Sequence, residues 1–224
     1  MVPMDVMKAM KLRHSVRAYE DRPIEQEIVE ALNAYIDRLN DESGLNIGLT
    51  LDEPTAFTGP LAHYGSFKNC KNYITVCAEN GRDEDIGYFG EKLVLYAQQL
   101  GLNTCWVALT CNKRRVRHTC RKGERLQIVI SVGYGAHSGV PHKNKPLEKQ
   151  CSYEGETMPE WFAAAMKAVR MAPTAVNQQR FHFALLDGDR VKARHLVGPC
   201  AKIDLGIAKY HFELGAGEHP FEWA

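Results

Sequence analysis

The sequence lacks long apolar segments, closely spaced cysteine pairs and a strong net charge. No run of about 18 apolar residues occurs among its 224 residues, so it predicts no membrane-spanning helix. The formal net charge of +1 gives no overall attraction to nucleic acids or membranes, and an anion site must therefore be a local cluster. The first residues also lack the apolar core of a secretory signal. We expect a cytoplasmic protein that binds neither nucleic acid nor membrane.

The seven cysteines include no C-x-x-C pair. Three of them, Cys77, Cys105 and Cys200, have apolar or small neighbours in the sequence. We expect reduced, buried thiols and no metal site. A metal-dependent hydrolase is an alternative, but its possible ligands do not have the spacing of a ligand pair on one helix or strand. Those possible ligands are His63, His118, His137, His142 and Cys120.

Apolar spacing along the chain predicts six helices and four strands. Glycines and prolines interrupt the pattern from 41 to 71, where we expect a long loop. Residues 157–160 have the form of a capping box. The expected helices follow Pro3 and Pro23, precede Gly101, and cover 112–121, 159–171 and 204–214; the expected strands cover 73–77, 104–109, 126–132 and 181–186.

A short internal repeat follows two of the expected strands. Asp85-Ile86-Gly87 opens one helix and Asp204-Leu205-Gly206 opens another. Aspartate caps helix starts, and glycine lets another chain segment approach closely. Three matched residues can arise by chance, but the matched order of elements favours a duplication. We therefore expect two pseudo-symmetric halves, residues 1–150 and residues 151–224, packed as one globular unit.

Two basic clusters have side chains that suit a phosphate group. The segment from Arg13 to Arg17 places two guanidiniums, an imidazole and a hydroxyl at a helix end. Lys143 and Lys145 lie two residues apart in a later loop. A solvated basic patch and a solubilising linker are the respective alternatives.

Two other segments suit a flat polar ligand. Residues 172–179 combine a helix-ending proline, small residues and three amides, which match the polar edge of a ring. Residues 100–108 lead from a glycine turn into an apolar strand, whose backbone amides can lie beside a ring. The alternatives are a turn whose amides bond to backbone and an ordinary core strand.

Together the four segments resemble the motifs of the nitroreductase family. The family's opening motif is matched here by Arg-His-Ser-x-Arg at 13–17, followed by Tyr19 and Pro23. Its other motifs are matched by Ala-Pro-Thr-Ala-x-Asn-x-Gln at 172–179, Leu-Gly-Leu at 100–102, and Lys-x-Lys-Pro at 143–146. The resemblance implies an α+β fold with a mostly antiparallel sheet flanked by helices.

The resemblance also implies a site for flavin mononucleotide (FMN). In the family, the opening motif and the late basic pair hold the phosphate, the strand after the glycine turn directs a backbone amide to flavin N5, and the proline-containing segment covers the other end of the ring. The phosphate would be held by Arg13, His14, Ser15, Lys143 and Lys145, and the pyrimidine side of the flavin would be reached by Arg17. The ring would be flanked by Trp106, Val107, Ala108 or Leu109. Its other end would be covered by Pro173, Thr174, Ala175 and Asn177.

Two departures from the family pattern are visible. The Pro-Thr-Ala-x-Asn segment ordinarily follows the opening motif closely and contacts the flavin of a partner subunit, whereas here it lies about 160 residues downstream. A subgroup of nitroreductases resembling a dimer condensed into one chain shows this order, and we expect a monomeric pseudo-dimer. The asparagine and lysine that many members place before the strand at 73–77 have no match, which leaves open what stabilises reduced flavin N1.

The implied activity is two-electron transfer from NAD(P)H through FMN to a nitroaromatic, quinone or similar acceptor. Because the flavin carries the chemistry, we name no catalytic side chain. A flavin-binding carrier or sensor without turnover is the main alternative, and the metal-dependent hydrolase is the less favoured one.

Overall fold

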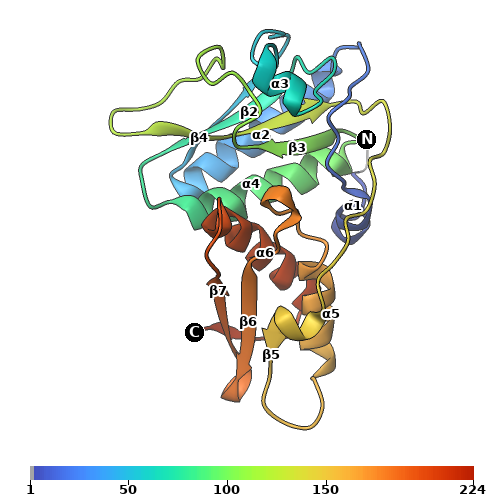
Figure 1. Cartoon of the computed structure of the whole chain (residues 1–224), viewed down its shortest axis with the longest axis vertical. Helices are drawn as coiled ribbons and strands as arrows, with labels where there is room; N and C mark the ends of the chain where they lie inside the picture. Colours follow the sequence, from blue (N-terminus) through green and yellow to red (C-terminus); the bar gives the residue numbers. More distant parts are fainter. Residues whose placement is uncertain (1–2) are drawn as a thin grey trace. The chain divides into compact units, whose positions relative to one another are not determined.

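The structure is a computed structural model that describes residues 3–224 and divides into two compact units (Figure 1). The first unit contains residues up to 82 and residues 92–141, and the second contains residues 83–91 and 142–224. Helix α4 (Asp83–Gln99) begins in the second unit and continues in the first. No helix in the described part of the chain is long and apolar enough to cross a membrane.

The first unit is built on a four-stranded antiparallel sheet in the order β1-β2-β4-β3. Strand β2 is buried along its whole length, because it lies between two other strands and consists mostly of apolar residues. Gly101 ends α4 with φ of 85°, a conformation that favours glycine. The elements of this unit besides α4 are α1 (Val6–Leu12), α2 (Gln26–Ser43), β1 (Asn46–Thr50), α3 (Pro60–Tyr64), β2 (Tyr73–Ala78), β3 (Asn103–Val107) and β4 (Arg125–Gly133).

The second unit contains a smaller sheet in the order β5-β6-β7-β8. Strands β6 and β7 are antiparallel, and the two-residue strands at the edges pair in parallel. Alternate residues of β6 are buried, and Phe183 stacks on Phe212 of α6. The elements are η1 (Leu147–Lys149), β5 (Cys151–Ser152), α5 (Glu160–Val169), η2 (Ala175–Asn177), β6 (Phe181–Leu186), η3 (Asp187–Asp189), β7 (Arg190–His195), α6 (Ala201–Ala216) and β8 (Glu222–Trp223).

The start of α4 crosses α6 at the two glycines of the repeated motif. A Cβ atom on Gly87 would lie 2.0 Å from the carbonyl oxygen of Ile203, and one on Gly206 would lie 1.9 Å from that of Glu84. Each obstacle lies three residues before the opposite glycine, so the two contacts are reciprocal. Nearby, His211 Nε2 lies 3.0 Å from Glu91 Oε1, and both side chains are fully buried.

The α+β class and the antiparallel sheet are confirmed, but several local predictions were wrong. The segment 41–71 is not all loop, because it contains β1, which pairs with β2, and α3. No helix forms over 112–121, where backbone groups bond to the sheet and to neighbouring loops instead. The capping box is absent, since α5 begins at Glu160 and Pro159 takes the N-cap position without a side-chain bond.

The expectation of seven reduced thiols was also wrong. Cys77 of β2 and Cys120 form a disulfide across 43 residues of sequence, with their Cα atoms 5.5 Å apart. Sequence spacing cannot reveal this pairing, because it depends on how the loop after β3 folds back onto the sheet. The free cysteines are Cys70, Cys105, Cys111, Cys151 and Cys200.

Candidate functional site

The opening motif leaves α1 and runs beside the start of β3. Arg13 is the C-cap of α1 and has extended dihedrals, so the chain continues as a strand-like segment. The Val16 N–H donates to the Thr104 carbonyl at 3.0 Å, and Ser15 pairs with Thr104 as a parallel bridge. The structure therefore brings two of the four predicted segments together in the first unit.

The side chains of the motif gather around Cys105. Burial raises the pKa of the Cys105 thiol, whereas the charges of Arg17 and Arg13 and a hydrogen bond with Ser15 act in the opposite direction. Arg13 is 3% exposed, and Arg17 lies at the surface. His14 and Ser15 are half-buried. The motif thus combines a buried cation, an exposed cation and a hydroxyl within a few residues of β3.

Tyr19 fixes the motif to the sheet. Its buried hydroxyl donates to the Val16 carbonyl at 2.8 Å and lies 2.6 Å from Ser131 Oγ. Ser131 in turn donates to the Cys105 carbonyl at 3.4 Å. A Cβ on Gly133 would lie 3.0 Å from the Tyr19 ring, so the glycine leaves room for it. The sequence indicates Tyr19 only as a motif position. In the structure, its hydroxyl holds the backbone between Ser15 and Arg17 against the sheet.

Strand β3 is an edge strand, since it pairs with β4 alone in its sheet. Because the Thr104 carbonyl faces the opening motif, strand alternation directs the backbone of Trp106 to the same edge. Val107 is buried, and Ala108 is half-buried. Leu109 lies beyond the end of β3 and is 74% exposed, so the predicted strand is two residues too long. Trp106 is therefore the strand residue whose amide best fits a ligand at this edge.

The other two predicted segments meet in the second unit. The Lys143 carbonyl accepts hydrogen bonds from Asn177 Nδ2 at 2.9 Å and from Gln179 Nε2 at 2.8 Å. Lys145 Nζ donates to the Gln178 carbonyl, and the Lys145 N–H donates to Gln179 Oε1 at 3.0 Å. The lysine-containing loop and the Pro-Thr-Ala-x-Asn segment thus form one hydrogen-bonded structure, and the amides of Asn177 and Gln179 are used within it.

Asp204 of α6 binds the Pro-Thr-Ala-x-Asn segment through two hydrogen bonds. Its carboxylate accepts from the Ala175 N–H at 3.0 Å and from Gln178 Nε2 at 2.7 Å. Burial raises the pKa of Asp204 to about 6, while the hydrogen bonds from Gln178 and Ala175 oppose that rise. The sequence indicated Asp204 only as a helix cap. Its actual role, bonding a segment about 30 residues earlier, has no local sequence signal.

The backbone of this segment is strained. Val176, Asn177 and Gln179 have φ values of 46°, 54° and 45°. Positive φ is rare for residues with side chains and is least favourable for a β-branched residue such as Val176, which is also 90% exposed. Pro173 is buried and Thr174 is half-buried. Strain of this kind persists where surrounding contacts enforce it, and it is concentrated at functional sites.

The residues of the alternative metal site do not gather. Across residues 3–224, no group of three or more His, Cys, Asp or Glu side chains could hold a metal ion. Cys120 is in the disulfide, and His142 Nε2 lies 2.9 Å from the Arg170 carbonyl. Before β2, the sequence has no match for the asparagine and lysine of many family members. There, Lys71 pairs with Asp21 at 2.7 Å.

The fold places the chain in the class of nitroreductase-like proteins. A "putative nitroreductase" of Thermotoga maritima is similar over 96% of this chain and 85% of its own, with a TM-score of 0.69 and 21% identity. An FMN-dependent nitroreductase of Clostridium difficile covers 58% of this chain and 88% of its own (TM-score 0.47, 18% identity). A "putative NADH dehydrogenase/NAD(P)H nitroreductase" of Parabacteroides distasonis covers 64% and 95% (TM-score 0.49, 23% identity).

Within that class, the chain belongs to the family described as "Putative TM nitroreductase", whose sequence pattern matches residues 5–216. No curated protein matches it. Family membership makes the chain a nitroreductase-type protein and confirms the resemblance seen in its motifs.

Proposed function

We propose that the chain is an FMN-dependent oxidoreductase that passes two electrons from NAD(P)H to a nitroaromatic, quinone or similar acceptor. The observation that carries the proposal is the placement of the opening motif along the edge of β3, with the Val16 N–H bonded to the Thr104 carbonyl at 3.0 Å. This contact supports the proposal, because it brings side chains suited to a phosphate group next to the strand that would flank the flavin ring.

The donors in this set fit an FMN phosphate. Arg13 and Arg17 supply charge-assisted hydrogen bonds, and His14 and Ser15 add neutral donors. In the second unit, Lys143 and Lys145 supply further positive charge, and we propose that they bind the same phosphate. Lys145 keeps donor capacity for it, because an ammonium group has three N–H donors and the bond to the Gln178 carbonyl uses one of them.

The proposed protein roles are to bind and to orient. When bound, FMN supplies the two-electron chemistry. The Trp106 amide, with Val107, Ala108 and Leu109 around it, would orient the ring, and Arg17 would reach its pyrimidine side. Residues Pro173, Thr174, Ala175 and Asn177 would cover its other end. Asp204 holds this covering segment through its bond to the Ala175 N–H.

Rapid mixing with NADH or NADPH tests the activity. The purified protein should be yellow, either nucleotide should bleach its flavin absorption, and an added quinone or nitroaromatic should restore it. A flavin-containing protein that neither nucleotide bleaches would instead be a carrier or sensor. A protein that neither contains nor takes up FMN would exclude both functions.

Replacing Arg13 with alanine tests the phosphate site. The loss of a desolvated, charge-assisted contact is worth about 2–3 kcal/mol, so FMN affinity should fall by roughly tenfold to a hundredfold. Arg190→Ala, at an exposed position of β7, removes one charge elsewhere and should leave the affinity unchanged. An Arg13→Ala protein that binds FMN as tightly as the wild type would show that the phosphate is held elsewhere.

We also propose that one chain completes one flavin site without a partner. The reciprocal contacts of Gly87 and Gly206 support a condensed dimer. The Arg-His-Ser cluster occurs once in the sequence, and the second half begins instead with Cys-Ser-Tyr-Glu at 151–154, where the acidic residue would repel phosphate. Sedimentation at low concentration should show about one FMN per monomer. Flavin loss in step with dissociation of a dimer would contradict this proposal.

A further inference from the structure

The loop between β3 and β4 concentrates positive charge. Residues 112–122 contain six lysine and arginine residues and no aspartate or glutamate. Because the whole chain has a formal net charge of +1, the rest carries five more negative than positive charges. We call this segment the cationic loop; it is the green-to-yellow connection that extends beyond the sheet in Figure 1. Its cations are Lys113, Arg114, Arg115, Arg117, Arg121 and Lys122.

The backbone of the cationic loop is anchored at short intervals. Val116 is buried in the core of the first unit, and the Arg117 N–H donates to the Tyr73 hydroxyl at 2.8 Å. The Thr119 carbonyl accepts from Asn46 Nδ2 at 2.7 Å, and Cys120 is joined to the sheet by the disulfide. An anchored loop loses little conformational freedom when a partner binds, so more of the interaction energy is retained.

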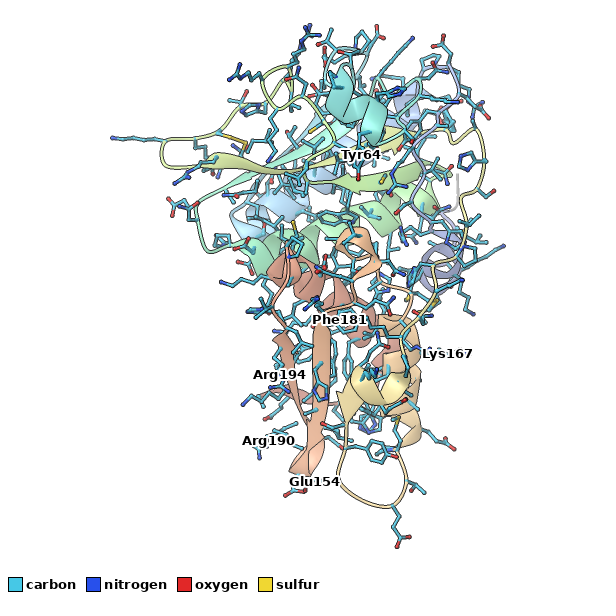
Figure 2. All side chains as sticks on the ribbon, in the orientation of Figure 1. Tyr64, Glu154, Lys167, Phe181, Arg190 and Arg194 are labelled. Atoms are coloured by element: carbon cyan, nitrogen blue, oxygen red, sulfur yellow. A yellow bond between two sulfur atoms is a disulfide. The ribbon has the colours of Figure 1, made fainter. Side chains whose placement is uncertain are left out.

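The charged side chains extend away from this anchored backbone. All six cations are exposed, and Figure 2 shows nitrogen-tipped side chains extending outward from the loop. Within the described residues, the only ion pair of the set joins Arg121 to Glu124 at 3.7 Å. Arg115 donates to the Thr58 hydroxyl at 3.1 Å. The loop therefore presents mostly uncompensated charge, which contributes little to the fold.

We propose that the cationic loop is a docking surface for the acidic face of another protein. Four of its six cations are arginines, whose guanidinium groups bind carboxylates in pairs of parallel hydrogen bonds. An acidic face of limited size can contact the cationic loop without reaching the rest of the surface. This docking does not depend on the proposed flavin chemistry.

A nucleic acid fits the loop less well. Residues 112–122 contain no aromatic side chain on which a base could stack. An extended polyanion would also reach past the loop to the rest of the surface, which is negatively charged overall. The effect of charge falls off within about 8–10 Å at physiological salt, so only groups that dock directly on the loop are strongly attracted.

Fluorescence anisotropy with two labelled probes tests the proposal. The probes are an oligoglutamate peptide and a single-stranded oligonucleotide of equal net charge, each titrated with the full chain at low and at physiological salt. We expect the oligoglutamate to bind more tightly than the oligonucleotide and to weaken as salt rises. The variant K113Q/R114Q/R117Q should lose about tenfold in oligoglutamate affinity, since each exposed pair contributes modestly.

A matched control separates the loop from net charge. The variant R190Q/K192Q/R194Q removes three exposed cations from β7 and should keep wild-type affinity for the oligoglutamate. Circular dichroism would verify that both variants are folded. Equal weakening in both variants, stronger binding of the oligonucleotide, or no binding of the oligoglutamate at low salt would each overturn the proposal.

Discussion

Alanine at either glycine of the α4–α6 crossing should destabilise the protein, and the two substitutions should cost nearly the same. A methyl group on Gly87 or on Gly206 would meet a backbone carbonyl oxygen at 2.0 Å or 1.9 Å. Backbone cannot rotate away as a side chain can, so the helices must separate by about 1 Å. An unobstructed Gly→Ala change in a helix gains about 1 kcal/mol. Overpacking costs about 1–3 kcal/mol or more, and a backbone obstacle belongs at the upper end, so we expect a net loss of about 2 kcal/mol.

Thermal unfolding followed by circular dichroism measures this loss. A change of about 2 kcal/mol should lower Tm by roughly 4–8 °C in a chain of this size. The double variant should lose less than the sum of the two single losses, because the separation that admits one methyl group also admits the other. Gly48→Ala is the control, since its Cβ would meet nothing nearer than Thr75 Oγ1 at 3.6 Å. It should change stability by less than about 0.5 kcal/mol.

Two results would refute this reasoning. A Gly87→Ala or Gly206→Ala protein as stable as the wild type would show that the helices do not approach as closely as described. Losses that differ by more than about 1 kcal/mol would show that the crossing is not reciprocal, because equal obstacles on equivalent backbones must cost similar amounts.

Three further predictions concern the buried groups. The pKa of Asp204 is raised to about 6, above its unfolded value, so its contribution to stability is fully present below about pH 4 and is lost as pH rises through 6. Urea unfolding at several pH values should show that Asp204→Asn removes this pH-dependent component. Reducing the Cys77–Cys120 disulfide, which spans 43 residues, should cost up to about 4 kcal/mol; a reductant should lower the Tm of the wild type but not that of Cys120→Ser. Tyr19→Phe leaves the Val16 carbonyl and the Ser131 hydroxyl without their buried partner, which should lower the free energy of unfolding by about 1–3 kcal/mol and weaken FMN binding in a fluorescence titration. Tyr64→Phe, at an exposed position, should change neither quantity.

Elements whose burial follows from their own residues could be predicted from the sequence. Strands β2 and β4 are runs of β-branched and apolar residues, and helices α2 and α5 show apolar faces at helical spacing. Each of these patterns needs no knowledge of the rest of the chain. Their bounds shifted by a few residues at most: α5 was expected over 159–171 and covers Glu160–Val169.

Elements that depend on distant partners could not be predicted. Strand β1 has the alternation of a strand, with Ile47 and Leu49 between polar or small residues, but the glycines and prolines around it indicated a loop. Its pairing with β2 decides its structure. The stretch around Val116 resembles a helix in composition, but its backbone bonds to Tyr73 and its Cys120 bonds to Cys77. These contacts are set by how the sheet folds, which local spacing does not record.

The candidate site was predicted unevenly for the same reason. The residues alone left a solvated patch as the better interpretation of the opening motif, and only the combination of four motifs favoured a binding site. The bonds of Asn177 and Gln179 to the Lys143 carbonyl join two segments more than 30 residues apart. Their amides were expected to face a ligand, with bonds to backbone as the alternative, and the structure shows bonds to backbone.

The reciprocal crossing of α4 and α6 affects how a chain of this kind can vary. Where two identical subunits meet on a twofold axis, every inherited change enters the interface twice. In a duplicated chain, Gly87 and Gly206 are encoded separately, so one copy can diverge while the other keeps its role. A substitution at Gly87 changes one side of the crossing while Gly206 keeps the other side unchanged, which a dimer of two identical chains does not allow.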